Sequence, residues 1–259
     1  MKKNYHTHHE LCRHAKGTAE DYVKKAIEAN LEVLGFSDHA PSAVITHDQR
    51  MRFDELETYL EDVETMKRKY KNQIEIHTGL EIEYLDSNHE YYRDLGRKVE
   101  YFILGQHYIR PEDEKSRLRG SVGLKKGEDI INYAKSVKRA IETGMFNLVA
   151  HPDIYLSSYP RFDEVAEEAA NIIIDAAIKN DVPLEFNANG TRRGIVISEA
   201  GTHYKYPRKE FWDIAVEKGA KAILSADAHH PDQLGDKAIE ESEALIKDWG
   251  VTIIDTLKF

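Results

Sequence analysis

Nine residues of types that bind divalent metal ions stand at, or just beyond, the ends of short apolar segments of this chain. They belong to six motifs, which are His6-Thr7-His8 followed by His14, Asp38-His39, Gly79-Leu80-Glu81, Gly105-Gln106-His107, Ala150-His151-Pro152-Asp153 and Ser225-Ala226-Asp227-Ala228-His229. Imidazole and carboxylate ligands suit Zn, Mn or Fe, and the single cysteine, Cys12, excludes a thiolate cluster. The set predicts one multinuclear centre of divalent metal ions.

The first motif places two imidazoles on one face of a predicted strand. His6 and His8 are two residues apart, and strand side chains alternate between faces, so both rings can reach the same ion. His14 follows in the first loop and can reach the same end of the sheet. His9 points to the opposite side, where we expect it to pack against a helix or meet solvent.

Glu81 is the residue that could hold two metal ions close together. A carboxylate has two oxygens and can bridge two ions that are bound by separate imidazoles. Between ions ~3.5–4 Å apart, a water loses a proton near neutral pH and becomes a nucleophile, while both ions hold the oxygens of an in-line displacement. The predicted chemistry is therefore phosphoester hydrolysis. Asp227, or a water on a further ion, could supply the proton that the leaving alkoxide needs.

Short apolar segments alternate with segments of helical periodicity, which indicates repeated βα units around a parallel sheet. The predicted strands cover residues 3–7, 33–37, 74–82, 100–106, 146–150, 183–187 and 222–226. The predicted helices start with a capping-box-like segment at Thr18 and then cover 53–70, 90–98, 128–142, 163–179, 207–218 and 233–249. The fold class is therefore α/β, a TIM-like barrel of seven βα units. Residues 251–254 could add an eighth strand or pack outside as a tail.

The chain of 259 residues contains no linker rich in Pro, Gly or Ser, so we expect one domain spanning residues 1–259. Barrel enzymes carry their active sites at the carboxyl ends of the strands. All nine predicted ligands stand at those ends or just beyond them, which favours a shared site over nine unrelated polar residues.

The composition excludes several other classes of function. A formal net charge of −10 disfavours nucleic acid and anionic membranes as non-specific partners. No stretch approaches the ~20 apolar residues of a membrane helix, and the amino-terminal residues lack the apolar core of a signal peptide. The sequence therefore predicts a cytoplasmic protein with a small-molecule partner and no internal disulfide.

In their order along the chain, these motifs resemble those of the polymerase-and-histidinol-phosphatase (PHP) superfamily. The resemblance implies a distorted (β/α)7 barrel with three divalent metal ions. It implies a first ion on His6, His8, Glu81 and Asp227, a second on Glu81, His107 and His151, and a third on His14, His39 and His229. Gly105-Gln106-His107 departs from the Ser-Val-His-like sequence expected there, although the ligand is retained.

Three of the motifs, Gly79-Leu80-Glu81, Ala150-His151-Pro152-Asp153 and Ser225-Ala226-Asp227-Ala228-His229, are similar to those of histidinol-phosphate phosphatases of histidine biosynthesis. The resemblance implies a phosphomonoesterase that converts L-histidinol phosphate to L-histidinol and phosphate. The alternatives are a PHP-type phosphoesterase for nucleotides or phosphotyrosine, and a metal-stabilised binding module without turnover. An amidohydrolase is disfavoured, because no lysine stands at a strand end for carbamylation.

Arginines in the loops are the predicted phosphate ligands, because a guanidinium offers a fork of donors. Arg161 follows the strand that ends near His151, and Arg192 and Arg193 follow the strand at 183–187. Of these, Arg161 and Arg193 are predicted to act in catalysis together with Glu81 and Asp227. Asn189 and His230 are further candidates for substrate contact. The charged segment 110–126 could form a lid that carries Arg117 and Arg119.

Overall fold

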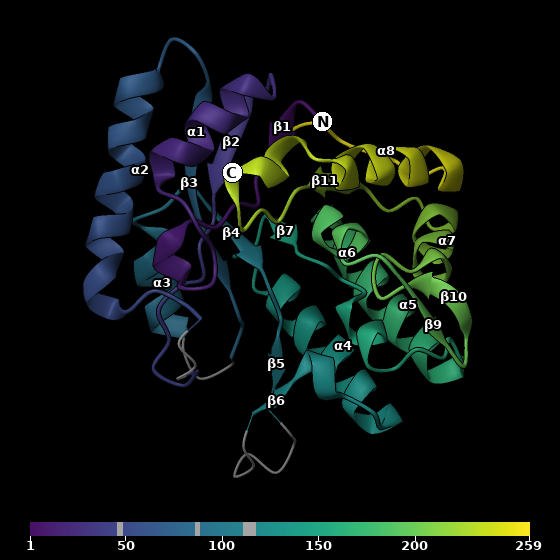
Figure 1. The fold of residues 1–259 in the computed structure, drawn as a ribbon. Helices are drawn as coiled ribbons and strands as arrows, with labels where there is room; N and C mark the ends of the chain where they lie inside the picture. The colour runs from purple at the N-terminus through teal and green to yellow at the C-terminus, as the bar shows by residue number, and fades with distance from the viewer. Residues whose placement is uncertain (46–48, 86–88, 111–117) are drawn as a thin grey trace.

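Seven parallel strands form one sheet at the centre of the protein, with helices packed around it (Figure 1). The structure is a computed structural model that describes residues 1–45, 49–85, 89–110 and 118–259. The strands are, in sheet order, β1 (Lys3–Asn4), β2 (Val33–Phe36), β3 (Glu75–Ile82), β4 (Tyr101–Leu104), β7 (Leu148–Val149), β8 (Leu184–Asn187) and β11 (Ala222–Ser225). Every neighbouring pair is parallel.

The sheet nearly closes on itself, because its first and last strands approach each other. Thr7, just beyond β1, forms a parallel bridge with Ala228, just beyond β11. The amide of His8 donates to the carbonyl of Ala228 at 2.8 Å. The predicted seven-stranded barrel of the distorted TIM type is confirmed. Ile253 forms one isolated bridge with Ala222, so segment 251–254 lies beside β11 and does not form an eighth named strand.

The helices follow the predicted βα order. Their bounds are α1 (Ala19–Glu28), α2 (Leu56–Tyr70), α3 (His89–Gly96), α4 (Gly127–Glu142), α5 (Glu164–Lys179), α6 (Ala188–Arg192), α7 (Lys209–Glu217) and α8 (Lys237–Trp249). The capping box at Thr18 is present, since its hydroxyl accepts from the Asp21 amide and the Asp21 carboxylate accepts from the Thr18 amide. None of the described helices is long and apolar enough to cross a membrane.

Three short features were not predicted from the sequence. Helix α6 directly follows β8, where no helix was predicted. Strands β9 (Ile195–Ser198) and β10 (Gly201–Tyr204) form an antiparallel hairpin after it, and β5 (Tyr108–Ile109) pairs with β6 (Arg119–Gly120). These pairs are too short for periodicity to reveal, and they lie outside the barrel sheet. They nevertheless carry residues to the mouth of the barrel.

Tyr101 fills the barrel interior below the carboxyl ends of the strands. Its hydroxyl donates to the backbone carbonyls of Tyr5 at 2.7 Å and Phe36 at 3.0 Å, so it connects β4 to the chain beside β1 and β2. Gly79 in β3 gives the ring its space, because a Cβ atom there would lie 2.4 Å from Cζ of Tyr101. The interior therefore fixes the spacing of the strands that carry the predicted ligands.

We expect Gly79→Ala to lower the free energy of unfolding by about 1–3 kcal/mol, because the new methyl group overpacks a ring that is held on both sides. Gly123→Ala is the matched control, since nothing lies within 4 Å of the Cβ position there. Urea unfolding of both variants measures the difference. Equal stability of the two variants would show that the interior around Tyr101 can relax at no cost.

Candidate metal centre

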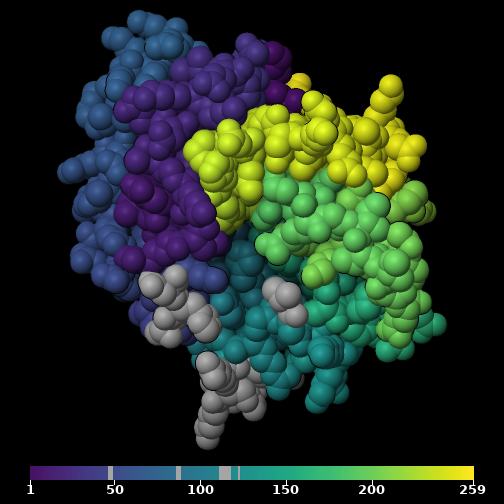
Figure 2. Space-filling model, viewed as in Figure 1, coloured from purple at the N-terminus to yellow at the C-terminus, as the bar shows by residue number. Residues whose placement is uncertain are grey.

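All nine predicted ligand residues lie at the carboxyl end of the barrel, around one cavity. The cavity has a volume of ≈ 320 Å³, and seven of the nine line it: His14, His39, Glu81, His107, His151, Asp227 and His229. The remaining two, His6 and His8, are completely buried beneath it. Figure 2 shows this hollow at the centre of the surface, between the purple amino-terminal segment, the yellow-green segment near the carboxyl terminus and the teal and green middle of the chain.

One oxygen of Glu81 faces the histidines of the first motif. Oε2 lies 3.4 Å from Nε2 of His6 and 3.3 Å from Nε2 of His8. The same oxygen lies 3.0 Å from Nδ1 of His39. Glu81 is only 2% exposed, so these contacts stabilise a charge that is largely removed from bulk water.

The other oxygen of Glu81 faces a different pair of histidines. Oε1 lies 3.2 Å from Nε2 of His151 and 3.7 Å from Nε2 of His107. Gly105 makes this position possible, because a Cβ atom there would lie 1.9 Å from Oε1 of Glu81. The glycine that departs from the expected family sequence therefore provides the space that the carboxylate occupies.

Asp227 joins the two histidines of the first motif to the loop after β11. Its Oδ1 lies 3.6 Å from Nε2 of His6, 3.4 Å from Nε2 of His8 and 3.4 Å from Nδ1 of His229. Its Oδ2 accepts from the side-chain amides of Asn187 at 3.1 Å and Asn189 at 3.2 Å. The carboxylate is thus oriented from one side by amides and offers its other oxygen to the imidazoles.

Two residues of the site have a left-handed backbone conformation that residues other than glycine seldom adopt. The φ angle is 29° at His151 and 45° at Asp227. Such backbone costs of order 1–3 kcal/mol and persists where the surrounding structure enforces it. At both positions it directs a side chain from a strand end into the cavity.

The donor atoms fit divalent cations. Nε2 of His6 lies 2.9 Å from Nε2 of His8, and Nε2 of His14 lies 2.9 Å from Nε2 of His229. Imidazole nitrogens that face one another in this way suit a shared cation, because each can direct a lone pair at it. Donor atoms within 4.8 Å of one another occur in the groups His6-His8-Glu81, His39-Glu81-His107, His14-His39-His229 and His8-Cys12-His229.

The outer nitrogens of several of these rings have acceptors, as is usual for metal-binding histidines. Nδ1 of His6 lies 2.7 Å from Oε1 of Glu185, and Nδ1 of His107 lies 3.1 Å from Oε1 of Glu83. Nδ1 of His14 lies 2.9 Å from the backbone carbonyl of Cys12. A proton on Nδ1 leaves the lone pair on Nε2, which is the nitrogen that faces the centre.

A family model described as the PHP domain matches residues 4–189 of this chain, which is well over half of it. The chain belongs to the PHP domain family. A Deinococcus radiodurans protein named "Probable histidinol-phosphatase" is 24% identical over 245 residues, which cover 89% of this chain and 87% of that protein. Histidinol-phosphatase of Bacillus subtilis is 23% identical over 267 residues, which cover 91% of this chain and 96% of that protein.

A solved structure of a similar protein shares the fold of this PHP domain. The histidinol phosphate phosphatase of Lactococcus lactis superimposes with a TM-score of 0.72 at 19% identity, covering 99% of this chain and 97% of that chain. Its structure was determined in complex with zinc, L-histidinol and phosphate.

Two buried acids that contact the predicted ligands, Glu185 and Glu83, were not predicted from the sequence. Glu185, in β8, is fully buried and also accepts from the backbone amide of His151 at 2.9 Å. Glu83 receives a bidentate ion pair from Arg50, at 2.8 and 3.0 Å, besides its contact with His107. The sequence feature that could have indicated them is a charged residue in or beside an apolar strand. Such a residue is rarely buried without a partner.

The predicted substrate residues of this PHP domain divide into two groups. Arg193 and Asn189 line the cavity, together with Lys205 and Tyr206, which the sequence analysis did not select. Arg192 points away from it and pairs with Asp236 at 2.7 Å.

The other candidates lie outside the cavity lining. Arg161 is 66% exposed and pairs with Glu199 at 2.9 Å, and His230 caps the short helical segment Pro231–Gly235. Of the predicted lid, Arg119 pairs with Asp129 at 2.8 Å, whereas Arg117 lies outside the described residues. His9 packs edge-on against Tyr59 of α2, as expected.

The surroundings of the centre shift the pKa values of its histidines in different directions. Burial would lower the pKa of His6, but Glu185, Asp227 and Glu81 outweigh it and hold the pKa well above the usual value. The pKa of His8 is raised in the same way, mainly through Asp227, Cys12 and Glu81. Burial, reinforced by His8, lowers the pKa of His229 to about 3.

The two carboxylates of the centre stay ionised. Burial would raise the pKa of Glu81, but nearby imidazoles, chiefly that of His39, hold it well below the usual range. Burial is likewise outweighed at Asp227, where His6 and His8 hold the pKa well below its usual value. The centre therefore presents two negative charges beside His6 and His8, and these two imidazoles must give up a proton before they can bind a cation.

We expect cation binding to release protons, with an affinity that rises with pH between about 6 and 8. The raised pKa values of His6 and His8 mean that both rings carry protons near neutral pH, and a cation must displace those protons. Titration calorimetry with Zn²⁺ or Mn²⁺, in two buffers of different ionisation enthalpy, measures the number released. Heats that do not depend on the buffer, with an affinity that is flat across this range, would contradict the expectation.

Proposed function

We propose that this PHP domain is a metal-dependent phosphomonoesterase that hydrolyses L-histidinol phosphate to L-histidinol and phosphate in histidine biosynthesis. The observation that carries the proposal is the position of Glu81, whose two oxygens face two separate sets of imidazoles beside an open cavity. The relatives named histidinol-phosphatase span about nine tenths of the chain and support the substrate. The Lactococcus lactis relative binds zinc, L-histidinol and phosphate, which supports the same assignment.

Three divalent ions, Zn, Mn or Fe, would occupy this centre. The first would be held by His6, His8, Glu81 and Asp227, the second by Glu81, His107 and His151, and the third by His14, His39 and His229. The contacts of Oε1 and Oε2 support Glu81 as the carboxylate shared by the first two. The group His14-His39-His229, whose donor atoms lie within 4.8 Å of one another, supports the third.

When bound, such ions act as Lewis acids and lower the pKa of water, which supplies the nucleophile for hydrolysis. The side chains of the protein orient the reaction. Arg193 lies at the cavity wall, where its guanidinium can donate to phosphoryl oxygens that the cations do not neutralise. Arg193 also lies beside Tyr206, and it partly opposes the burial that raises the pKa of that hydroxyl.

Asp227 is a poor proton donor for the leaving alkoxide. Its Oδ2 already accepts two amide hydrogen bonds, and its pKa is held well below the usual range. Of the two proton sources that the sequence left open, the geometry therefore favours water. Asp227 would instead hold a cation and stay charged throughout.

A phosphoesterase for a more anionic substrate, such as a nucleotide, is the second candidate. Lys205 is exposed at the cavity and adds a second cation beside Arg193. The carboxylates that line the described part of the cavity, Glu81, Glu83 and Asp227, all face histidine or arginine partners. None of these three carboxylates is therefore left to pair with the ammonium group of histidinol. That group would instead have to bind against aromatic rings such as those of Tyr108 and Tyr206.

Replacing Glu81 by Ala should lower turnover of any phosphomonoester substrate by several orders of magnitude, because nucleophile activation and charge stabilisation would be lost together. Bound metal, measured by elemental analysis, should fall in the same variant, while circular dichroism should be unchanged. Glu217→Ala, which removes an exposed carboxylate from α7, is the control. Near-normal activity of the Glu81 variant would exclude a mechanism with paired ions.

Arg193→Ala should weaken catalysis on histidinol phosphate by about 2–4 kcal/mol in kcat/KM, without a change in metal content. Arg161→Ala tests the sequence prediction that this second arginine also contacts phosphate. We expect it to change kcat/KM much less, because its guanidinium is exposed and paired with Glu199. Equal losses in both variants would place Arg161 in the substrate complex.

The same assays decide the substrate. The wild-type protein should hydrolyse L-histidinol phosphate faster than nucleotide monophosphates, phosphotyrosine and other monoesters. A preference for nucleotides, lost in Lys205→Ala, would establish the second candidate. Metal binding with no hydrolysis of any ester would leave a binding module as the function.

A further inference from the structure

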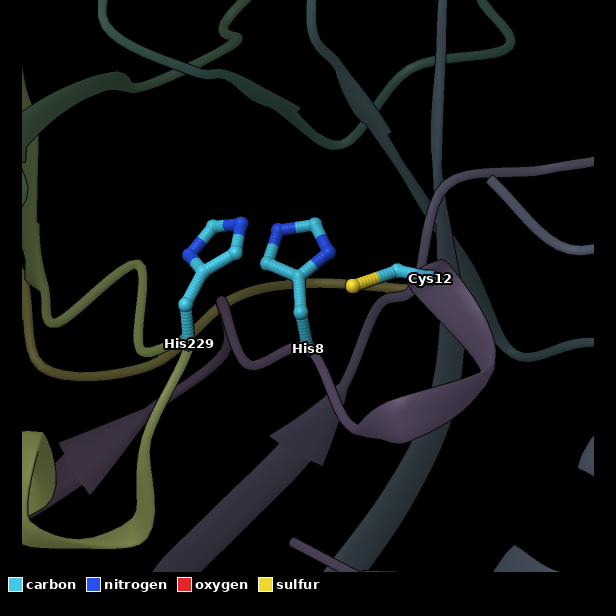
Figure 3. A group of neighbouring side chains, drawn as sticks. All are labelled: His8, Cys12 and His229. Atoms are coloured by element: carbon cyan, nitrogen blue, oxygen red, sulfur yellow. The ribbon is translucent and has the colours of Figure 1, made fainter. Parts of the chain in front are cut away.

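Cys12 is the single cysteine of the chain, and it lies directly beneath the centre. It ends the short helical segment Glu10–Cys12, between β1 and α1, and its side chain is completely buried. Figure 3 shows its sulfur directed at one edge of the His8 ring, with His229 on the other side of that ring. The donor atoms of His8, Cys12 and His229 lie within 4.8 Å of one another.

The two nitrogens of His8 have unequal surroundings. Nε2 faces the centre, at 2.9 Å from Nε2 of His6 and 3.3 Å from Oε2 of Glu81. Nδ1 is buried and has no hydrogen-bond partner of ordinary geometry among the described residues. Asp38 does not serve, because its Oδ1 lies 3.8 Å away and its Oδ2 contacts His9 at 2.6 Å. The polar atom drawn beside this edge of the ring is the Cys12 sulfur.

Two other histidines of the centre have a carboxylate within hydrogen-bonding distance of Nδ1, which His8 lacks. Nδ1 of His6 has Glu185 at 2.7 Å, and Nδ1 of His107 has Glu83 at 3.1 Å. Such acceptors keep the proton on Nδ1 and so direct the lone pair of Nε2 at the ion. A completely buried ring that lacks an acceptor could take either tautomer, and one of the two cannot bind a cation through Nε2.

We infer that Cys12 is the positioning residue for His8, and that its sulfur accepts a hydrogen bond from Nδ1–H of that ring. The inference rests on the proposed metal centre. A sulfur acceptor is weaker than a carboxylate. His8 then donates less electron density to its ion than His6 does.

Cys12 also contacts a ligand of a different proposed ion. Its backbone carbonyl accepts from Nδ1 of His14 at 2.9 Å. The side chain of Cys12 thus lies beside proposed ligands of the first and third ions, His8 and His14, and its backbone carbonyl holds His14 as well. A side-chain substitution should disturb both rings, but it removes the Nδ1 partner only of His8, because the backbone contact of His14 is retained.

The test compares Cys12→Ala and Cys12→Ser with the wild-type protein. Glu185→Gln is the matched variant for His6, and Ser136→Ala, which removes a buried hydroxyl from α4, controls for a small void. Zn²⁺ affinity is measured by competition with a chelator, and the imidazole nitrogens of the zinc-loaded protein are followed by NMR.

We expect Cys12→Ala to weaken binding at the tightest affected zinc site by roughly 10–100-fold, the range seen when an outer partner of a ligand is removed. Cys12→Ser should lose less, because its hydroxyl can accept but reaches less far. The Nδ1 signal of His8 should change in both variants, while that of His6 changes only in Glu185→Gln. Ser136→Ala should match the wild type.

Two results would overturn the inference. One is a Cys12→Ala variant with wild-type zinc affinity and an unchanged His8 signal, in a wild-type protein that binds zinc. The other is a thiolate-to-cobalt charge-transfer band in the Co²⁺-loaded wild type that is absent from Cys12→Ser, because the sulfur would then be a direct ligand. A wild-type protein that binds no divalent metal would instead refute the proposed centre and this inference with it.

Discussion

The carboxylate of Glu81 is the interaction on which the rest of the site depends. It is a buried charge, and burying a charge is costly unless partners surround it. Its partners come from four different strands and their following loops, and they approach its two oxygens from two directions. β3 delivers it from the interior of the sheet, where Glu81 is in register with Ile103 of β4 and bridges to His39 beyond β2. A shift of one residue in β3 would turn this carboxylate out of the cavity.

Around this carboxylate, the structure is arranged in successive layers of support. The imidazoles contact Glu81 and Asp227, and Glu185 and Glu83 contact the outer nitrogens of two of those rings. Glu83 is in turn fixed by Arg50, which also donates to the carbonyl of Ala40 at 3.2 Å. Each outer side chain restricts the orientations of the side chain that it contacts. In this way a set of flexible side chains can be held in the fixed positions that metal binding requires.

The sequence was sufficient to predict the barrel and the gathering of the nine predicted ligand residues around one cavity, because both follow from position along apolar strands. It could not predict which neighbours face the cavity. Arg192 and Arg193 are adjacent at the end of α6, and successive helical residues point in directions about 100° apart. The directions of the two side chains therefore depend on the residue at which α6 begins, which is set by its Asn187 cap. With this start, Arg193 lines the cavity and Arg192 pairs with Asp236. Arg161 was chosen because of its loop, but a loop position does not specify the direction of a side chain.

The supporting residues were harder to predict for a different reason. Glu185 and Glu83 act through contacts with residues distant in sequence, and no local spacing connects Glu185 to His6, or Arg50 to Glu83. Cys12 presented no pattern at all, since one cysteine has no spacing. Its surroundings are visible only when the first loop is folded beneath the imidazoles.

Closure of the barrel between Thr7 and Ala228 also determines when the site can exist. The histidines of the amino-terminal motif leave the ribosome long before Asp227 and His229, with which they lie side by side in the folded barrel. During synthesis, His6 and His8 therefore remain without Asp227 until β11 and the loop after it have been made. The complete candidate centre can therefore form only after β11 has been made, and a chain that stops short of β11 would keep several of these histidines without the carboxylate of Asp227 that lies beside them.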